Sequence, residues 1–107
     1  MPKKFSVDIT ETAEADVAKI WEHIALDKPE AATAFVLRLE EQIGTLESFP
    51  ERCSLVPENE LLGTVYRHLV YGNYRTIIKI AGDRVIIMRV LHGAQLLDIG
   101  LLEGLEK

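Results

Sequence analysis

The chain has 107 residues, of which 48% are apolar, 27% charged and 7% aromatic. This length corresponds to one domain, residues 1–107, with a single hydrophobic core, and the apolar fraction excludes a disordered chain. No apolar run approaches the roughly 20 residues of a membrane-spanning helix, and the start MPKKFSVDIT lacks the apolar stretch of a secretory signal. The one cysteine, Cys53, has no partner for an internal disulfide, so we expect a cytoplasmic protein without a metal or other cofactor.

The net charge of −5 is unevenly distributed along the chain. Residues 1–64 carry 13 acidic and 6 basic side chains, whereas residues 65–95 carry 5 basic and 1 acidic. A basic segment within an acidic domain is consistent with an acidic or polyanionic partner, although fluctuations of this size also occur in chains without such a partner.

A short strand and a helix are predicted at the N-terminus. Residues 4–9 alternate between polar and apolar, as a half-buried strand does, and Thr10 or Thr12 can then cap a helix. Apolar residues recur through this helix at helical spacing, namely Val17, Ile20, Trp21, Ile24 and Ala25. The stripe predicts that Trp21 is a core residue.

A second helix is predicted to begin at Pro29, which suits a first turn, and to end at Pro50. Its apolar stripe consists of Ala32, Phe35, Leu39, Ile43 and Leu46. Because the connection between the two helices is short, we expect them to pack as an antiparallel hairpin.

The C-terminal half is predicted to form a loop, residues 50–64, followed by three antiparallel strands. Gly72-Asn73 and Gly82-Asp83 match two-residue hairpin turns. They separate strands at Val65–Tyr71, Tyr74–Ala81 and Arg84–His92. With the N-terminal strand and a helical hairpin on one face of this small, mainly antiparallel sheet, the fold class is α+β. Residues 96–107 form a leucine-rich tail.

The two turns also predict the strand register, and therefore which residues share a face of the sheet. Pairing across both turns places Arg75 opposite Val90. The mixed face then carries Tyr66, His68, Val70, Arg75, Ile77, Lys79, Ile86, Met88, Val90 and His92. The other face is more apolar, and we expect it to pack on the helices, with Arg67 and Arg89 paired to acidic residues at an edge.

The mixed face holds an apolar patch of Ile77, Met88 and Val90. Exposed patches of this kind usually mark an interface. Either a partner protein or the chain's own tail can cover it. The apolar residues of that tail are Leu96, Leu97, Ile99, Leu101, Leu102 and Leu105.

Arg75 and His92 are the candidate catalytic pair. On the predicted register their Cβ atoms lie roughly 7–8 Å apart. A guanidinium can hold a phosphate through two hydrogen bonds, and an imidazole can transfer a proton near neutral pH, so the pair suits phosphodiester chemistry. The alternative is that both residues have structural roles only.

Two long segments, DVAKIWEHIALDKPEAATAFVLRLEEQIGTLESFPE and YRHLVYGNYRTIIKIAGDRVIIMRVLHGAQLLD, carry a resemblance to a known family. Their most specific parts are the stretch through Pro29, the FPE at 49–51, the YR at 74–75 and the RVLHG at 89–93. On these motifs the chain, over about residues 5–98, resembles the ParE/RelE superfamily of toxins from type II toxin–antitoxin, or plasmid stabilisation, modules.

The resemblance implies a small α+β toxin that is neutralised by a cognate antitoxin, whose C-terminal segment wraps it. RelE-like members of the superfamily cleave mRNA on the ribosome without a metal, and ParE-like members block DNA gyrase. Arg75 falls on the arginine that holds the scissile phosphate in the RNases. His92 falls where some of them have a catalytic basic residue or histidine.

Three residues after His92 bear on the choice between these branches. Gly93 stands where some of the RNases carry a tyrosine, Ala94 is not basic, and the net charge is acidic where RNA binding favours a basic protein. The HGA sequence favours the ParE branch, in which the arginine common just beyond it is here Gln95. The hypotheses are a gyrase inhibitor without enzymatic chemistry, a metal-independent endoribonuclease using Arg75 and His92, and an attenuated toxin that only binds antitoxin.

We expect the antitoxin to bind the mixed face of the sheet. Apolar anchors would supply most of the affinity, and basic side chains would attract an acidic peptide. The expected contact residues are Val70, Arg75, Ile77, Lys79, Met88 and Val90. An extended segment can also pair along the free edge of Val65–Tyr71. Other expected partners are gyrase or the ribosome with its mRNA, and homo-oligomers or hetero-oligomers with antitoxin are compatible with the sequence, whereas no membrane contact is expected.

Overall fold

The computed structural model describes residues 4–97 and 99–102. In chain order the strands and α-helices are β1 (Ser6–Ile9), α1 (Glu11–Ala25), α2 (Pro29–Gly44), β2 (Ser54–Leu55), α3 (Asn59–Leu62), β3 (Arg67–Tyr71), β4 (Tyr74–Ala81), β5 (Arg84–His92) and α4 (Ile99–Leu102). Two short 3-10 helices, Thr45–Glu47 and Pro50–Arg52, lie between α2 and β2. The α+β class is as predicted. The segment predicted as a loop, 50–64, contains the short elements β2 and α3. No helix in the described part of the chain is long and apolar enough to cross a membrane.

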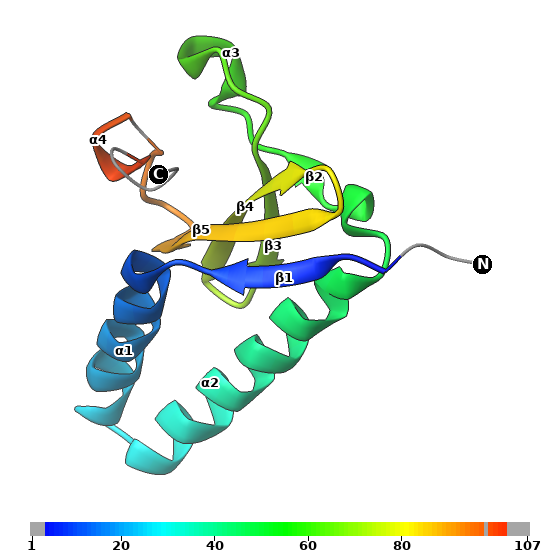
Figure 1. Ribbon diagram of the computed structural model, residues 1–107. Coiled ribbons are helices and arrows are strands. Elements are labelled where there is room, and N and C mark those ends of the chain that lie inside the picture. Colours follow the sequence, from blue (N-terminus) through cyan, green and yellow to red (C-terminus); the bar gives the residue numbers. More distant parts are fainter. Residues whose placement is uncertain (1–3, 98, 103–107) are drawn as a thin grey trace.

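The five strands form one sheet in the order β1-β5-β4-β3-β2. The N-terminal strand β1 runs parallel to the last strand, β5, and lies beside it in Figure 1. The other neighbouring strands are antiparallel. The sheet is therefore mainly antiparallel, and the first and last strands of the chain are neighbours at one edge of it.

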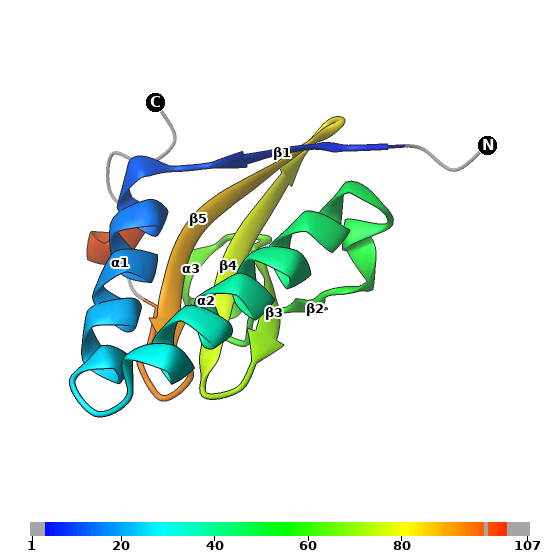
Figure 2. The same cartoon turned by 90° about the horizontal axis from the view of Figure 1, so that it is seen from below.

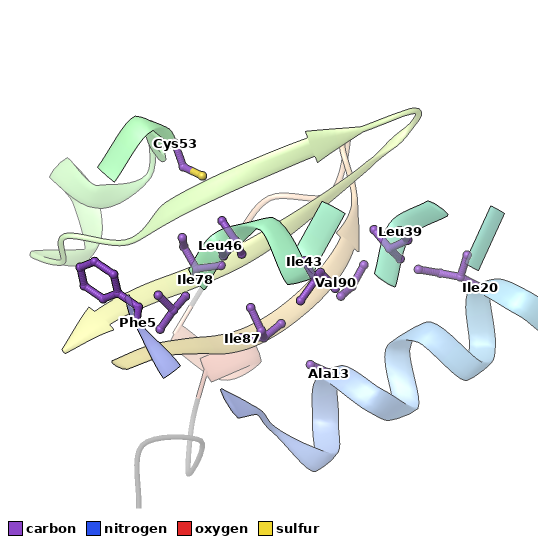
Figure 3. Packing of buried hydrophobic residues seen from close by; sticks show 11 residues of the cluster. Phe5, Ala13, Ile20, Leu39, Ile43, Leu46, Cys53, Ile78, Ile87 and Val90 are labelled. Atoms are coloured by element: carbon purple, nitrogen blue, oxygen red, sulfur yellow. The ribbon is translucent and has the colours of Figure 1, made fainter. Parts of the chain in front are cut away.

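Each face of the sheet is covered by a different part of the chain. The hairpin of α1 and α2 lies against one face (Figure 2), and the first apolar cluster fills the space between them, with Leu39, Ile43, Ile78 and Ile87 among its buried members (Figure 3). A second cluster lies on the opposite face. It contains Val56, Tyr66, Ile77, Met88, Leu91, Leu97 and Leu102.

Thr10 joins the start of α1 to β5. Its Oγ1 accepts a hydrogen bond from the backbone N–H of Ala13 at 3.1 Å, which makes it the N-cap of the helix. The same hydroxyl donates to the carbonyl oxygen of Ile87 at 3.0 Å. Of the two threonines that the sequence offered as caps, the helix uses the one that also bonds to the sheet.

Trp21 lies at the margin of the helical hairpin, so its prediction as a core residue is wrong. The residue is 40% exposed, and its indole N–H donates to the hydroxyl of Thr33 on α2 at 3.2 Å. Ala13 and Ile20 are the buried apolar residues of α1. The apolar stripe is wider than the face that the sheet covers, and Trp21 is on its uncovered side.

A β-bulge in β5 changes the register that the turns predict. Pairing next to both turns is as predicted. Farther along, Ile78 pairs with Ile87 but its neighbour Ile77 pairs with Arg89, so Met88 is an extra residue. A bulge of one residue exchanges the faces of everything beyond it.

The end of β5 consequently presents different side chains than expected. Arg75 lies opposite Leu91, not Val90. Val90 packs in the first cluster, against the helices, and His92 pairs with Tyr74. The prediction that Val90 and His92 share a face with Arg75 is therefore wrong.

Arg89 pairs with an acidic residue, as predicted, whereas Arg67 bonds to backbone carbonyl oxygens instead. The Nε and Nη2 of Arg89 donate to the carboxylate of Asp16 on α1 at 2.7 and 2.8 Å. The Nη1 of Arg67 donates to the backbone carbonyl oxygens of Cys53 and Glu51 at 2.7 and 3.1 Å. Each arginine thus fastens a neighbouring segment to the sheet.

The chain's own C-terminal segment covers the apolar patch of the second face. Ile77 and Met88 are completely buried, and they pack with Leu97 and Leu102. The sequence allowed either a partner protein or the tail to cover this patch, and in the structure the tail covers it. Leu105 lies outside the described residues.

Candidate functional site

A hollow of about 620 Å³ opens beside the start of β4. Its walls come from α3 and the loop before it, from β3, the following turn and the start of β4, and from the end of β5 and the segment after it. The lining residues are Pro57, Glu58, Leu61, His68, Val70, Gly72, Asn73, Tyr74, Arg75, His92, Gly93, Ala94 and Leu96. Arg75 and His92 therefore line the same hollow, although they belong to different faces of the sheet.

The guanidinium of Arg75 is held by a carboxylate of this chain. Arg75 is 5% exposed and Glu58 is 8% exposed. The Nη1 of Arg75 donates to Oε1 of Glu58 at 3.1 Å, and its Nη2 donates to Oε2. This is the bidentate geometry that makes arginine–carboxylate pairs strong and directional.

Two further groups surround the same guanidinium. Its Nη2 donates to the carbonyl oxygen of Gln95 at 2.9 Å, and its Nη1 lies 3.3 Å from Nδ1 of His68. The remaining nitrogen, Nε, is buried and has no hydrogen-bond partner among the described residues. Arg75 is thus enclosed, and an outside phosphate has no free Nη atom to bind.

Glu58 connects the loop before α3 to the segment after β5. Besides binding Arg75, its Oε2 accepts the backbone N–H of Leu97 at 2.9 Å. Leu97 is itself buried in the second cluster. The carboxylate therefore joins three segments that are remote in sequence.

The electrostatics of this cluster follow from these contacts. The hydrogen bonds from Arg75, helped by that from Leu97, outweigh burial and lower the pKa of Glu58 to about 2. The pKa of His68 is lowered, first because burial disfavours the charged ring and second because Arg75 is close. At neutral pH the cluster therefore holds a carboxylate, a guanidinium and a neutral imidazole.

His92 is exposed at the end of β5. Its ring packs edge-on against Tyr74, with 5.5 Å between the ring centroids. Its Nδ1 accepts the backbone N–H of Ala94 at 3.1 Å, so the proton of the neutral ring resides on Nε2. The hydrogen bond orients the ring at the rim of the hollow.

The predicted antitoxin surface is only partly exposed. Val70 is 63% exposed on the rim of the hollow, and Lys79 is half-buried. Ile77, Met88 and Val90 are buried within the chain, so they form no open patch as the structure stands. A contact role for the six residues stays a prediction.

Sequence reasoning missed Glu58, the residue that controls the environment of Arg75. It lies in a stretch rich in proline and acidic residues that is typical of a loop, and nothing in that stretch indicates a partner 17 residues away. The proximity of His68 to Arg75 could be predicted from the sequence, because both residues were expected on one face of adjacent strands.

A family model for the ParE toxin of the type II toxin–antitoxin system parDE matches residues 7–97. The chain belongs to this ParE toxin family. The match covers four strands in full, β1 from Val7 onward, and the residues that line the hollow. No curated protein shows significant similarity to the chain.

Solved structures have the fold of this ParE-family toxin. One, described as the chromosomal ParDE toxin–antitoxin system from P. aeruginosa, is 23% identical over 84% of this chain and 97% of the other, with a TM-score of 0.66. Another, the toxin–antitoxin complex RelBE2 from Mycobacterium tuberculosis, is 27% identical over 83% and 98% of the two chains, with a TM-score of 0.56. The ParE/RelE superfamily indicated by the sequence motifs is thereby confirmed.

Proposed function

We propose that this toxin acts by binding and inhibits DNA gyrase without enzymatic chemistry, and that a cognate antitoxin neutralises it. Membership of the ParE family supports the target. Similarity to toxin–antitoxin complexes supports the antitoxin partner. The acidic net charge of −5 also favours a protein target over RNA.

The enclosure of Arg75 is the observation that carries this proposal. Phosphodiester cleavage by this chain would need a guanidinium that can hold the scissile phosphate. Both Nη atoms of Arg75 are instead bonded within the chain, chiefly to Glu58. His92, the other half of the candidate pair, lies on the other face of the sheet.

The alternative is a metal-independent, ribosome-dependent mRNA endoribonuclease, and one observation favours it. His68, Arg75 and His92 all line the same hollow. Under this alternative His92 transfers a proton, and the His92→Ala variant loses cleavage by about 100-fold or more while it remains folded.

The antitoxin contact that we propose runs along the outer edge of β3. β2 pairs with Arg67 and His68 only, which leaves the outer edge of residues 69–71 open among the described residues. The exposed side chains of Leu61, Val70 and Leu96 lie around the adjoining hollow. An extended antitoxin segment could add a strand there and place its apolar side chains in the hollow.

Induced expression in a bacterial host tests the target. A gyrase inhibitor gives a DNA-damage response and gyrase–DNA cleavage complexes, and it leaves mRNA intact. An endoribonuclease gives cleaved mRNA on translating ribosomes, and His92→Ala reduces this cleavage by about 100-fold or more. Rescue by co-expressed antitoxin tests the partner. mRNA cleavage without a DNA-damage response would overturn the gyrase proposal.

A further inference from the structure

A smaller hollow lies between α1 and the end of β5. Figure 2 shows the helix running beside this strand, and the hollow has a volume of about 290 Å³. Tyr74 and His92 line both this hollow and the one around Arg75, so the two spaces share these rings. The other polar side chains that line the smaller hollow are Asp16, Lys19, His23, Arg89 and Gln95.

Asp16, the acidic residue among these, is already neutralised within the chain. It is buried, and its two oxygens accept hydrogen bonds from Nη2 and Nε of Arg89 at 2.8 and 2.7 Å. Its Oδ2 also accepts the backbone N–H of Val90 at 3.0 Å. The carboxylate and the guanidinium cancel each other's charge, so this pair gives the hollow no net charge.

Two basic side chains of α1 line the hollow beside this pair. Lys19 and His23 are four residues apart, and they therefore project from the same side of the helix. Both are exposed, and neither forms an ion pair among the described residues. The ammonium of Lys19 supplies a full positive charge and three N–H donors.

The opposite side of the hollow adds further donors. The Nδ1 of His92 accepts the backbone N–H of Ala94 at 3.1 Å, so the Nε2–H of the neutral ring is left to donate. Tyr74 contributes a hydroxyl and Gln95 a side-chain amide, and both groups can donate a hydrogen bond. Donors therefore line the hollow from the helix, from the sheet and from the segment after β5.

Donors around one uncompensated positive charge suit an oxyanion. Lysine binds phosphate as a point charge, and imidazole N–H groups donate to its oxygens. The volume is close to the lower end of the roughly 300–1,000 Å³ that small-molecule sites occupy. Because the whole chain has a net charge of −5, a long polyanion is disfavoured, whereas a single small anion is not.

We propose that this hollow binds the phosphate group of a small phosphomonoester, such as a nucleotide or a sugar phosphate. Lys19 and His23 hold the phosphate from α1, and Nε2 of His92 donates to it from β5. The remainder of the ligand lies against Tyr74 and Gln95. This site is separate from the proposed antitoxin contact at β3, and it does not depend on the target of the toxin.

The three histidines of the chain report on the two hollows separately. His23 lines only the smaller hollow, His68 only the one around Arg75, and His92 lines both. The probes are inorganic phosphate, a nucleoside monophosphate and the same nucleoside without phosphate, each titrated into the full chain at fixed pH and ionic strength. Imidazole proton signals in NMR spectra should shift saturably for His23 and His92 with the two phosphates. They should not shift with the nucleoside, and His68 should not respond.

Matched lysine variants distinguish this hollow from general attraction of anions. Lys19→Gln removes the positive charge that lines it, whereas Lys28→Gln removes an exposed charge from the connection between α1 and α2, outside the hollow. We expect about tenfold weaker binding of the nucleoside monophosphate for Lys19→Gln, as for a lost hydrogen bond to a charged group. Lys28→Gln should change the affinity less than twofold. Thermal melts confirm that both variants are folded.

Several outcomes would overturn the proposal. Equal weakening by both variants would mean nonspecific attraction, and unchanged signals of His23 would mean that no phosphate binds in this hollow. Shifts of His68 and His92 without His23 would place the anion in the hollow around Arg75. Shifts with a short DNA duplex but not with the nucleoside monophosphate would assign the contact to a nucleic-acid backbone instead of a small molecule.

Discussion

Glu58 and Arg75 form a bidentate ion pair that the C-terminal segment closes from outside. The pair joins the loop before α3 to the start of β4, and the backbone of Gln95 and Leu97 bonds to its two members. An arginine that its family resemblance marks as a phosphate ligand thus serves in this chain as the centre of a structural cluster.

Removing the carboxylate of this pair should destabilise the fold strongly. Glu58→Gln leaves the buried guanidinium of Arg75 without its counter-ion, which we expect to cost about 3–5 kcal/mol. Asp8→Asn is the control. It breaks the exposed pair of Asp8 and Arg84 and should cost less than about 1 kcal/mol. Urea denaturation of both variants measures the difference, and equal small losses would mean that Arg75 is held adequately by its other partners.

Lowering the pH should reduce the free energy of unfolding, because it protonates the carboxylate of Glu58. The pKa of Glu58 is lowered from 4.5 to about 2, so the folded state binds this proton less readily than the unfolded state. The resulting stabilisation, about 3 kcal/mol, is fully present above pH 4.5 and is lost as pH falls toward 2. Urea denaturation of the parent and of Glu58→Gln across this range should show a shallower pH dependence for the variant. Parallel curves would contradict the assignment.

Trp21 should contribute less to stability than a tryptophan in a core. Because it is 40% exposed, we expect Trp21→Ala to cost about 1–2 kcal/mol, below the roughly 3–5 kcal/mol of a fully buried tryptophan. Leu39 on α2 is 1% exposed, and Leu39→Ala should cost about 2–5 kcal/mol. Thermal melts that rank the two variants in the opposite order would contradict the position of Trp21.

Two glutamate substitutions should separate folding from antitoxin binding. Met88 is completely buried under the C-terminal segment, so Met88→Glu places an unpaired charge in the second cluster and should greatly lower the melting temperature of the free toxin. Val70→Glu changes an exposed residue beside the open edge of β3. It should melt like the parent and bind antitoxin about tenfold or more weakly in a titration, if the antitoxin pairs there. Normal binding by Val70→Glu would place the contact elsewhere.

Much of the fold could be predicted because local chemistry determines it. The glycine-containing turns at 72–73 and 82–83 define three strands and their pairing near each turn. The proline and threonine signals define where the helices begin. These features depend on neighbours in sequence, and sequence patterns report such features well.

The bulge at Met88 could not be predicted, because it interrupts a continuous apolar run. Ile86, Ile87 and Met88 have no polar residue between them, so no alternation indicates which side each one faces. No glycine in this run indicates a bulge. The faces of Val90 and His92 were consequently exchanged, and the predicted catalytic pair was divided between the two sides of the sheet.

The candidate site was predictable only in part, for a related reason. Arg75 was identified because it has a characteristic neighbour, Tyr74, in a recognisable motif. Its partner Glu58 is an acidic residue among several in an irregular segment, and the tertiary structure alone selects it. The exposure of Trp21 likewise depends on how far the sheet extends beneath α1.

The parallel pairing of β1 with β5 has a consequence for synthesis of the toxin. Residues 6–9 acquire their strand partner, residues 84–87, only when most of the chain has been made. Thr10 and Asp16, which attach α1 to β5, also bond to residues that are synthesised late. The helical hairpin therefore emerges from the ribosome with its apolar face uncovered, and contacts so distant in sequence are slow to form. The fold of this chain is therefore completed only when its last strand has left the ribosome.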